Sequence, residues 1–578
     1  MAVSLSAVSA WGGDGVARQA VVVLGGGVAG LTAAHELAER GFAVTVVEPK
    51  ALGGRARSIG VPGTATGGRQ DLPGEHGFRF FPGFYQDVIE LMSRITLPDG
   101  TGTVADNLVE VTEMMYARAE RRDEVVVDIS TIEDLTMSTL LRRIGGWLSQ
   151  GSTLAADEAL YYANRLMVFL TSCQERRRGQ WEYLPWWDFV AAADASVEYQ
   201  KVCAIGTSRS LVAARAEVAS TKTMGTVQEA FVLNNAGWAG NVSPPDRVLN
   251  APTNQAWIDP WLVHLASLGV RFRTGWAADR LRLTGSRIES VLLRDRSAAL
   301  EEMAADWFVL AVPLSEAVRL TRQDLVTADP GLAGLERLVC DWMVGLQFYL
   351  RRPTPILHGH VLYLDSPWAL TSISQAQFWR QIDFPATFGD GTVQDCLSVD
   401  ISDWDSPGVF GKPARECTRE EVAADVWAQL SAALNGRGDQ VLSDDLVHSW
   451  FLDPAVTGLG GPGRASNAEP LFINTVGSWD DCPHACTAIE NLFIAGDFAR
   501  TEVDLATMEG ATQSGRAAVN ALLERSGRAS PSCTVSPLPS PPQLASLHGI
   551  DVQMYRQGRP NIFDMPPPWS HATVSAGG

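Results

Sequence analysis

Hydrophobic and polar positions over residues 20–48 follow a strand, helix, strand pattern. Ala20–Leu24 is a short apolar run rich in β-branched residues, which is typical of a buried parallel strand. The apolar positions that follow recur at helical spacing, at Leu31, Ala34, Leu37 and Ala38. Gly41 is placed to end this helix, and residues 43–47 form a second apolar run. The pattern therefore predicts a βαβ unit.

Other regions of the chain carry weaker patterns of the same kind. Strand-like runs separated by turn residues occur at 269–273, 276–278, 288–293 and 307–313. A further apolar strand is predicted at 491–495, followed by a helix from about residue 508 to about residue 523. After a strand at 125–129, residues 135–233 are predicted to be mostly helical. Strands that alternate with helices in this way indicate an α/β protein.

Size and charge narrow the classes of partner. The chain has 578 residues, 46% of them hydrophobic and 19% charged, which is enough for two domains with large cores. Its formal net charge of −20 argues against a nucleic-acid partner, because phosphate binding requires a basic surface. The same charge disfavours broad adsorption to anionic membranes.

The cysteine pattern and the lack of a recognisable signal peptide predict a cytoplasmic protein without a metal site. The eight cysteines form no C-x-x-C pair, and no third ligand accompanies His358 and His360. Reduced thiols in the cytoplasm are expected. The first 19 residues lack a basic signal-peptide start, and no apolar run approaches 18 residues, so we expect no transmembrane segment. Peripheral contact with a membrane stays open.

A glycine fingerprint lies in the βαβ unit. Gly25, Gly27 and Gly30 have the G-x-G-x-x-G spacing, in which the glycines permit a tight turn, close approach to a pyrophosphate and close helix packing. Val28 and Ala29 lie within this turn at the start of the helix. Glu48 ends the second strand, where a carboxylate accepts hydrogen bonds from an adenosine ribose. These residues predict a dinucleotide site.

The residues after Glu48 point to a family. Gly53-Gly54-Arg55-Ala56-Arg57 resembles the diglycine-arginine motif of the flavin amine oxidase and phytoene desaturase superfamily. Two glycines let backbone N–H groups face a diphosphate, and an arginine adds a forked cationic donor. The resemblance implies that Gly53, Gly54, Arg55 and Arg57 lie beside the pyrophosphate of a non-covalently bound FAD.

Two later segments resemble other FAD-binding parts of this superfamily. Gly496 and Asp497 follow the strand at 491–495, and the resemblance implies that Asp497 binds the ribityl or pyrophosphate region. It also implies that the helix starting near Met508 directs its N-terminus at the flavin, with Thr507 and Ala511 beside it. A helix N-terminus carries partial positive charge, which stabilises an anionic reduced flavin. Backbone near Ala278 is implied to contact the adenine.

Pattern and resemblance together predict the domain organisation. We expect an α/β fold, with a Rossmann-like FAD-binding domain assembled from discontinuous segments and a mixed α+β substrate domain with a helical part. The FAD-binding segments are expected at 18–95, 246–320 and 471–525, and the substrate domain at 96–245 and 321–470. Pro and Ser dominate residues 526–542, which predicts a linker before a C-terminal tail at 543–578.

Residues 74–85, GEHGFRFFPGFY, provide the catalytic candidates. This segment resembles the flavin-facing segment of carotenoid desaturases and hydroxysqualene dehydroxylases. Phe78 and Arg79 are expected to face the flavin, and the aromatic residues to line an apolar channel or to pack in the core. Arg79, Glu75 and His76 are the candidates for catalysis, with a structural role open for each.

The substrate class is chosen between two enzymatic alternatives. Many flavin amine oxidases have a lysine near the flavin, and no lysine occurs between Lys222 and Lys412. We therefore expect an FAD-dependent oxidoreductase that desaturates a hydrophobic small molecule, of isoprenoid or polyene kind, by hydride transfer to the flavin. Amine oxidation is the alternative. A third possibility, of another class, is a non-enzymatic chaperone of prenylated proteins with the same fold. The sequence leaves the electron acceptor and the oligomeric state open.

Overall fold

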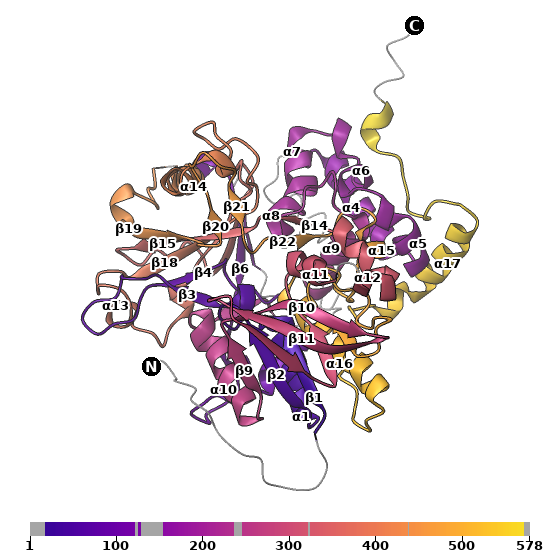
Figure 1. The fold of residues 1–578 in the computed structure, drawn as a ribbon. Helices are drawn as coiled ribbons and strands as arrows, with labels where there is room; N and C mark the ends of the chain where they lie inside the picture. Colours follow the sequence, from indigo (N-terminus) through magenta and orange to yellow (C-terminus); the bar gives the residue numbers. More distant parts are fainter. Residues whose placement is uncertain are drawn as a thin grey trace.

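The computed structural model describes residues 18–121, 125–128, 154–235, 245–321, 324–436 and 438–571. Figure 1 shows a parallel sheet at the centre, a larger and mostly antiparallel sheet on one side and a layer of helices on the other. The predicted fold class is confirmed: a Rossmann-like domain built from separated segments is joined to a mixed α+β domain. The domain limits given above stay predictions.

The parallel sheet is built from three distant parts of the chain. Its strand order is β23-β13-β1-β2-β9, and every neighbouring pair is parallel. The strands are β1 (Ala20–Leu24), β2 (Ala43–Glu48), β9 (Arg271–Thr274), β13 (Trp307–Leu310) and β23 (Leu492–Ile494). β1, β13 and β23 are continuous apolar runs because both of their faces are covered, whereas β9, at the edge of the sheet, has the partly exposed sequence RFRT.

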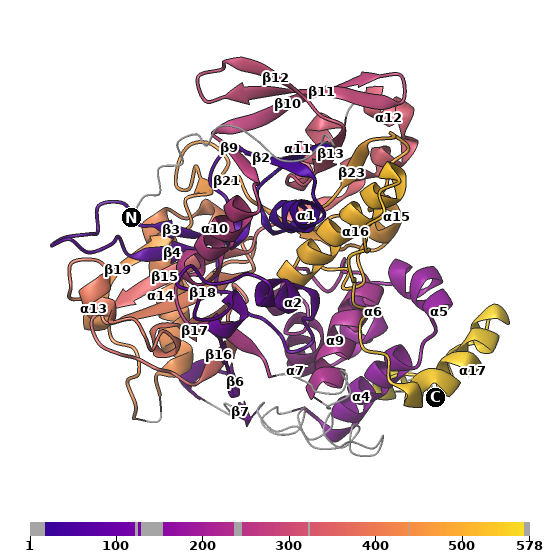
Figure 2. The same cartoon turned by 90° about the horizontal axis from the view of Figure 1, so that it is seen from below.

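Different elements cover the two faces of this sheet. Helices α1 (Val28–Glu39) and α16 (Met508–Ser526) lie side by side on one face (Figure 2), in a core with Val21 and Val23. The other face packs Val22 and Leu24 against an antiparallel sheet of β10 (Trp276–Thr284), β11 (Arg287–Asp295) and β12 (Leu300–Ala304). The alternation of side chains along β1 thus supplies both cores.

The second large sheet has the strand order β19-β15-β18-β17-β16-β6-β7. Its only parallel pair within the described residues is β16 with β6. One face packs against helix α14 (Arg419–Leu434), and the other turns toward the centre of the molecule. The strands are β6 (Glu113–Ala117), β7 (Val125–Asp128), β15 (Val344–Leu350), β16 (Gly359–Tyr363), β17 (Thr371–Ser374), β18 (Asp395–Ile401) and β19 (Val447–Leu452).

The helical layer forms its own core. Tyr162, Trp181, Trp186 and Tyr199 are buried in it, at 0–1% exposure. The helices are α4 (Ala156–Leu170), α5 (Gln174–Gly179), α6 (Trp186–Phe189), α7 (Val197–Tyr199), α8 (Arg209–Val212) and α9 (Thr221–Asn235). This agrees with the helical prediction over 135–233 as far as the described residues extend, because residues 129–153 lie outside them.

Short elements connect the layers. The strands among them form pairs: β3 (Ser58–Gly60) with β4 (Pro73–Glu75), β5 (Leu108–Glu110) with β8 (Arg247–Leu249), β14 (Val339–Asp341) with β22 (Leu471–Ile473), and β20 (Val456–Thr457) with β21 (Ser466–Asn467). The helices are α2 (Asp87–Ser93), α10 (Asp259–Ser267), α11 (Leu314–Leu320), α12 (Asp324–Ala328), α13 (Phe384–Thr387) and α15 (Ser478–Asp481).

The C-terminal part packs on the body of the molecule. Residues 528–541 have no regular structure, but Cys533 is buried and Leu538 packs against the core beside α1. Helix α17 (Ala545–Arg556) then lies against α5 (Figure 1). Across the part of the chain that the structure describes, no helix is both long and apolar enough to cross a membrane.

Candidate active site

A cavity of about 840 Å³ lies where the parallel sheet, the large antiparallel sheet and the helical layer meet. Almost all of the residues predicted to bind FAD line it. They are Gly25, Gly27, Val28, Ala29, Glu48, Gly53, Gly54, Arg55, Arg57, Phe78, Arg79, Ala278, Gly496, Asp497, Thr507, Met508 and Ala511. The fold therefore brings together residues that are almost 490 positions apart in the sequence. Their contacts with FAD stay predictions.

The remaining fingerprint glycine, Gly30, lies behind the cavity wall. A Cβ atom on Gly30 would lie 2.0 Å from the carbonyl oxygen of Gly25, so no other residue fits there. Gly25 itself has a φ of +107°, and a Cβ on it would meet the oxygen of Ala311 at 2.2 Å. These two glycines let helix α1 start directly against the sheet.

Glu48 fixes the shape of the glycine turn. One carboxylate oxygen accepts a hydrogen bond from the N–H of Gly26 at 2.9 Å, and the other accepts one from the N–H of Lys50 at 2.8 Å. The side chain lies at the end of β2 and is 9% exposed. A carboxylate oxygen has further acceptor capacity, so the predicted bond to a ribose stays compatible with these contacts.

The diglycine segment packs directly on the glycine turn. The N–H of Gly53 donates to the carbonyl of Gly26 at 2.7 Å, and Gly54, with a φ of +56°, would place a Cβ 2.8 Å from the Cα of Gly27. The Arg55 guanidinium pairs with Asp497 and donates to the carbonyl of Pro470 at 3.0 Å. The two predicted pyrophosphate-binding motifs and Asp497 thus form one continuous wall.

Arg57 has a different set of partners from Arg55. It donates to the carbonyl of Gly54 and lies 3.3 Å from a carboxylate oxygen of Glu469. Both arginines line the cavity, and only Arg55 reaches Asp497.

Two helix N-termini converge on the cavity. Val28 begins α1 and Met508 begins α16, and both line the cavity. The Thr507 hydroxyl caps α16 by accepting a hydrogen bond from the N–H of Gly510 at 3.0 Å. Helix N-termini favour anions because their N–H groups lack partners within the helix. Together with the adjoining glycine turns and two arginines, they fit a dinucleotide such as FAD.

The wall of the cavity exposes more apolar than polar surface, and both kinds of side chain line the part that lies toward the large sheet and the helical layer. This part is lined by strands β6, β16, β17 and β18 and by helices α4, α8 and α9. Its apolar residues are Phe78, Phe80, Met114, Val202, Leu211, Phe231, Met343, Leu362 and Leu364. Its polar residues are Tyr116, Tyr162, Thr207, Ser210, Gln228, Asp246, His360, Thr371 and Asp400.

Arg79 lines the cavity, and its expected place facing the flavin stays a prediction. One guanidinium nitrogen donates to the carbonyl of Gly77 at 2.5 Å, and the buried Nε has no hydrogen-bond partner. Gly77 passes so close to the sheet that a Cβ on it would lie 2.4 Å from an Asp400 oxygen. The segment therefore carries Phe78 and Arg79 across the sheet and into the cavity.

The other two catalytic candidates, Glu75 and His76, do not line this cavity. A carboxylate oxygen of Glu75 accepts hydrogen bonds from the N–H of Thr253 at 2.8 Å and from the Ser58 hydroxyl at 3.0 Å. The His76 ring pairs through Nδ1 with Asp453, and its Nε2 lies 2.9 Å from Glu469. Burial lowers the pKa of His76, but the two carboxylates raise it more, so the net shift is upward.

Sequence reasoning missed Asp400 and His360 as residues of the cavity. Burial raises the pKa of Asp400 to about 7, and Glu75 adds to the rise while Arg79 and the Phe78 N–H oppose it. Burial lowers the pKa of His360 to about 3, so this ring is neutral at physiological pH. Polar residues inside otherwise apolar strands were the available signal, because a buried strand places such a residue in the core or in a cavity.

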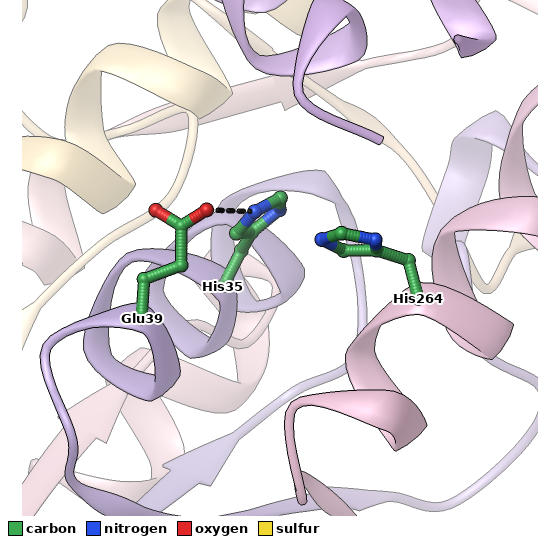
Figure 3. A group of neighbouring side chains, drawn as sticks. All are labelled: His35, Glu39 and His264. Atoms are coloured by element: carbon green, nitrogen blue, oxygen red, sulfur yellow. Dashed lines mark hydrogen bonds and ion pairs between the residues drawn. The ribbon is translucent and has the colours of Figure 1, made fainter. Parts of the chain in front are cut away.

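Away from the cavity, His35, Glu39 and His264 come together (Figure 3), with ligand-type atoms within 4.8 Å of one another. The indole N–H of Trp261 donates to Nδ1 of His35 at 3.1 Å, so Nε2 carries the ring proton and donates it to Glu39 at 3.0 Å. Coordination of a metal by Nε2 would need that nitrogen deprotonated. The hydrogen bonds of His35 are therefore satisfied by protein alone.

Comparison with known proteins agrees with this geometry. Residues 28–523 match the family described as "Flavin containing amine oxidoreductase". Among curated proteins, a search found no match. Solved structures with the same fold include an oxidoreductase from Methanosarcina mazei (14% identity, TM-score 0.56, 87% of this chain and 100% of that chain). Another is a putrescine oxidase bound to putrescine (12% identity, TM-score 0.57, 88% of this chain and 99% of that chain). A third is the cyclohexylamine oxidase of Brevibacterium oxydans (13% identity, TM-score 0.58, 89% of this chain and 100% of that chain).

The family match extends from the start of α1 to the last turns of α16, and so spans both ends of the cavity wall. The protein is a FAD-dependent oxidoreductase, and the alternative of a non-enzymatic chaperone is set aside. This chain belongs to the flavin containing amine oxidoreductase family.

Proposed function

We propose that this enzyme desaturates a hydrophobic small molecule, of isoprenoid or polyene kind, in the apolar part of its FAD cavity. The observation that carries this proposal is the apolar wall formed by Met114, Leu362 and Leu364 on the sheet and by Leu211 and Phe231 on the helices. Burial of apolar surface favours binding by about 25 cal/mol per Å². Such a wall therefore binds a long hydrocarbon more tightly than a small charged molecule.

The protein's own residues position the reactants and exclude water. Bound FAD would accept a hydride from a substrate C–H bond, which is the chemistry that the cofactor supplies. The glycine turns and the N-termini of α1 and α16 would hold the cofactor, and Phe78 and Arg79 would lie between it and the substrate. The aliphatic and aromatic walls would orient the substrate and keep water from the reacting carbon.

The positions of the lysines also support desaturation over amine oxidation, because many flavin amine oxidases have a lysine near the flavin. Among the described residues that line the cavity, the only lysine is Lys50, which is next to Glu48 at the end of β2. Lys222 instead pairs with Asp504 behind the wall. Amine oxidation stays the alternative, because the family description names amines and the putrescine and cyclohexylamine oxidases share the fold.

Non-covalent binding of FAD is part of the same proposal. No cysteine occurs among the described residues that line the cavity, so a thioether link to the flavin lacks a partner there. The expected result is that acid precipitation of the purified yellow protein releases the flavin into the supernatant. Flavin that stays with the precipitate would contradict this part of the proposal.

The substrate class is tested by anaerobic reduction of the bound flavin. The FAD-loaded protein is mixed with a panel of isoprenoid polyenes and a matched panel of aliphatic amines, and bleaching of the flavin absorbance is followed. We expect polyenes to bleach the flavin and amines to leave it oxidised. If only the amines bleach the flavin, the proposal of desaturation is wrong and the enzyme is an amine oxidase.

A further inference from the structure

Four neighbouring strands of the large sheet place one row of side chains along the cavity. Asp400 on β18 is opposite Thr371 on β17, which is opposite Leu362 on β16, which is opposite Tyr116 on β6. All four residues line the cavity. Because directly opposite residues on paired strands point to the same face, the row is continuous. Its acidic and hydroxyl side chains are adjacent at one end, and Leu362 follows them.

The Asp400 carboxyl is buried and has an oxygen atom that can still bind a polar group. The residue is 5% exposed, and its Oδ1 has no hydrogen-bond partner. The other interactions of this carboxyl are with the backbone N–H of Phe78, with the positive charge of Arg79 and with the negative charge of Glu75. A buried oxygen without a partner costs free energy comparable to a lost hydrogen bond, which a ligand group at this place would recover. Thr371, 5% exposed, adds a hydroxyl beside it.

The charges around Asp400 select the kind of group that fits. Arg79 supplies a positive charge beside this carboxyl, so the guanidinium would repel a substrate ammonium ion and offset part of its attraction to the carboxylates of Asp400 and Glu75. A neutral hydroxyl is not repelled, and it can both donate to the carboxyl and accept from the Thr371 hydroxyl. His360, on β16 beside β17, packs against Phe80 with ring centroids 4.1 Å apart, and its buried Nε2 has no hydrogen-bond partner.

We propose that Asp400 and Thr371 form a subsite for a neutral hydroxyl group carried by an otherwise apolar substrate. This inference rests on the proposed function, because it assigns one end of the same hydrophobic cavity. It makes the substrate an amphipathic molecule, whose hydroxyl is held at β18 while its hydrocarbon chain extends along Leu362 and the helices. Asp400 and Thr371 are then specificity-determining residues, in contact with the substrate.

The test measures binding rather than turnover. The FAD-loaded protein is brought to equilibrium by dialysis against radiolabelled 1-octanol, 1-octylamine or n-octane, which share a chain length and differ in the head group. We expect 1-octanol to bind at least about tenfold more tightly than either of the others, which corresponds to one hydrogen bond to a buried carboxyl. Asp400→Leu and Thr371→Val should each weaken 1-octanol binding and leave n-octane unchanged.

Matched variants separate this role from a structural one. Asp400→Asn, which keeps a donor and an acceptor at this position, should retain the preference for 1-octanol. Asp395→Asn is the control, because Asp395 is also buried on β18 but bonds the N–H of Thr354 and the hydroxyl of Ser374 outside the cavity. Arg79→Met should raise the affinity for 1-octylamine, since the repelling charge is gone.

The proposal is overturned if 1-octanol shows no saturable binding, if it binds no better than n-octane, or if Asp400→Leu binds it as tightly as the unchanged protein. These probes need not reduce the flavin, so this result is independent of the bleaching test. If polyenes bleach the flavin but 1-octanol binds no better than n-octane, the proposed function is kept and only the hydroxyl subsite is rejected.

Discussion

Gly54 and Gly63 both have a left-handed backbone, with φ of +56° and +79°, but their surroundings differ. A Cβ on Gly54 would lie 2.8 Å from the Cα of Gly27, whereas a Cβ on Gly63 would meet nothing within 4 Å. The two positions share the backbone strain of a non-glycine residue, about 1 kcal/mol, and only Gly54 adds a backbone clash. Alanine variants at these two positions therefore separate the effect of backbone strain from the effect of the contact with Gly27.

We predict that Gly54→Ala weakens FAD binding at least about tenfold, because the clash must separate the two turns that are predicted to face the cofactor. Gly63→Ala should bind FAD like the unchanged protein. The ratio of flavin to protein absorbance after purification, followed by fluorescence titration of the apoprotein with FAD, measures both variants. Equal losses in the two variants would show that the contact with Gly27 has no role.

His76 supports a second prediction at this scale. Its pKa is raised in the folded protein by Asp453 and Glu469, against the effect of burial. A raised pKa stabilises the fold fully below the unfolded value, about 6.5, and this contribution is lost as the pH rises through the folded value. We expect His76→Gln to lower the free energy of unfolding by about 2–3 kcal/mol at pH 6 and by much less at pH 9.

Urea unfolding at the two pH values gives the measurement. His448→Gln is the control, since His448 pairs with Asp390 at a partly exposed site. A penalty for His76→Gln that is the same at pH 6 and pH 9 would mean that the ring is not held as a cation.

Among single residues, the sequence predicted those with a motif and missed those without one. Gly25, Glu48 and Asp497 were predicted because fixed spacing ties them to a strand end. Asp400 lies inside the apolar run of β18, and nothing in its neighbours marks which face of which sheet it occupies. Only the pairing of β18 with β15 and β17 directs it into the cavity.

At the scale of elements, a buried ion pair joins helix α9 to the loop before α16. Lys222 pairs with Asp504, and its ammonium lies 3.6 Å from the centroid of the Trp479 ring. Asp504 also accepts hydrogen bonds from the Thr223 hydroxyl at 2.7 Å and from the Asn474 amide at 3.1 Å. The loop that it anchors leads into Thr507 and Met508, so the helical layer holds the N-terminus of α16 at the cavity.

Lys222→Met should therefore destabilise the fold by about 3–5 kcal/mol, because it leaves a buried carboxylate without its cation. The double variant with Asp504→Asn should recover part of this loss. Urea unfolding of the single and double variants measures the coupling. Lys412→Met, which breaks the exposed pair with Glu421, is the control and should leave stability unchanged. Additive losses in the two buried positions would contradict the coupling.

Elements with a strong local pattern were predicted, and those that depend on distant partners were not. β1, α1, β2 and α16 appear close to their predicted bounds, because apolar spacing and glycines specify them locally. β12 was missed: its sequence, LEEMA, is half exposed at a sheet edge and has no apolar run. The predicted strand at 307–313 ends earlier, at Leu310, before the turn that contains Pro313.

At the scale of the whole molecule, the C-terminal part is attached by a buried polar contact. Asp551 on α17 is 1% exposed and accepts hydrogen bonds from Arg176 at 3.0 Å and from the N–H of Cys173 at 2.8 Å. Arg176 is itself 2% exposed. Glu175, one residue earlier on α5, pairs with Arg556 of the same tail at an exposed site. One buried and one exposed ion pair thus join the same two helices.

We predict that Asp551→Ala lowers the stability of the helical layer by about 3–5 kcal/mol, since it leaves the Arg176 guanidinium buried without a carboxylate. Glu175→Ala should have no measurable effect. Thermal unfolding of both variants, with flavin release recorded separately, makes the comparison. If the two variants melt together, the tail is held by its apolar contacts instead.

The overall architecture was predictable only in part. The separated segments of the parallel sheet were expected because three motifs belong to one cofactor. The order of the large sheet was not, since its strands come from residues 113–128 and 344–452 and pair in an order that no local pattern encodes.

The composite wall of the cavity also sets when the enzyme can acquire its cofactor. The first glycine turn leaves the ribosome long before the wall opposite it, which needs Gly496, Asp497 and the start of α16 at Met508. Because domains fold only after their parts have been synthesised, the nascent chain has no complete cavity for FAD until this last segment has been made. A chain that is still shorter than this would leave its first glycine turn without the opposite wall.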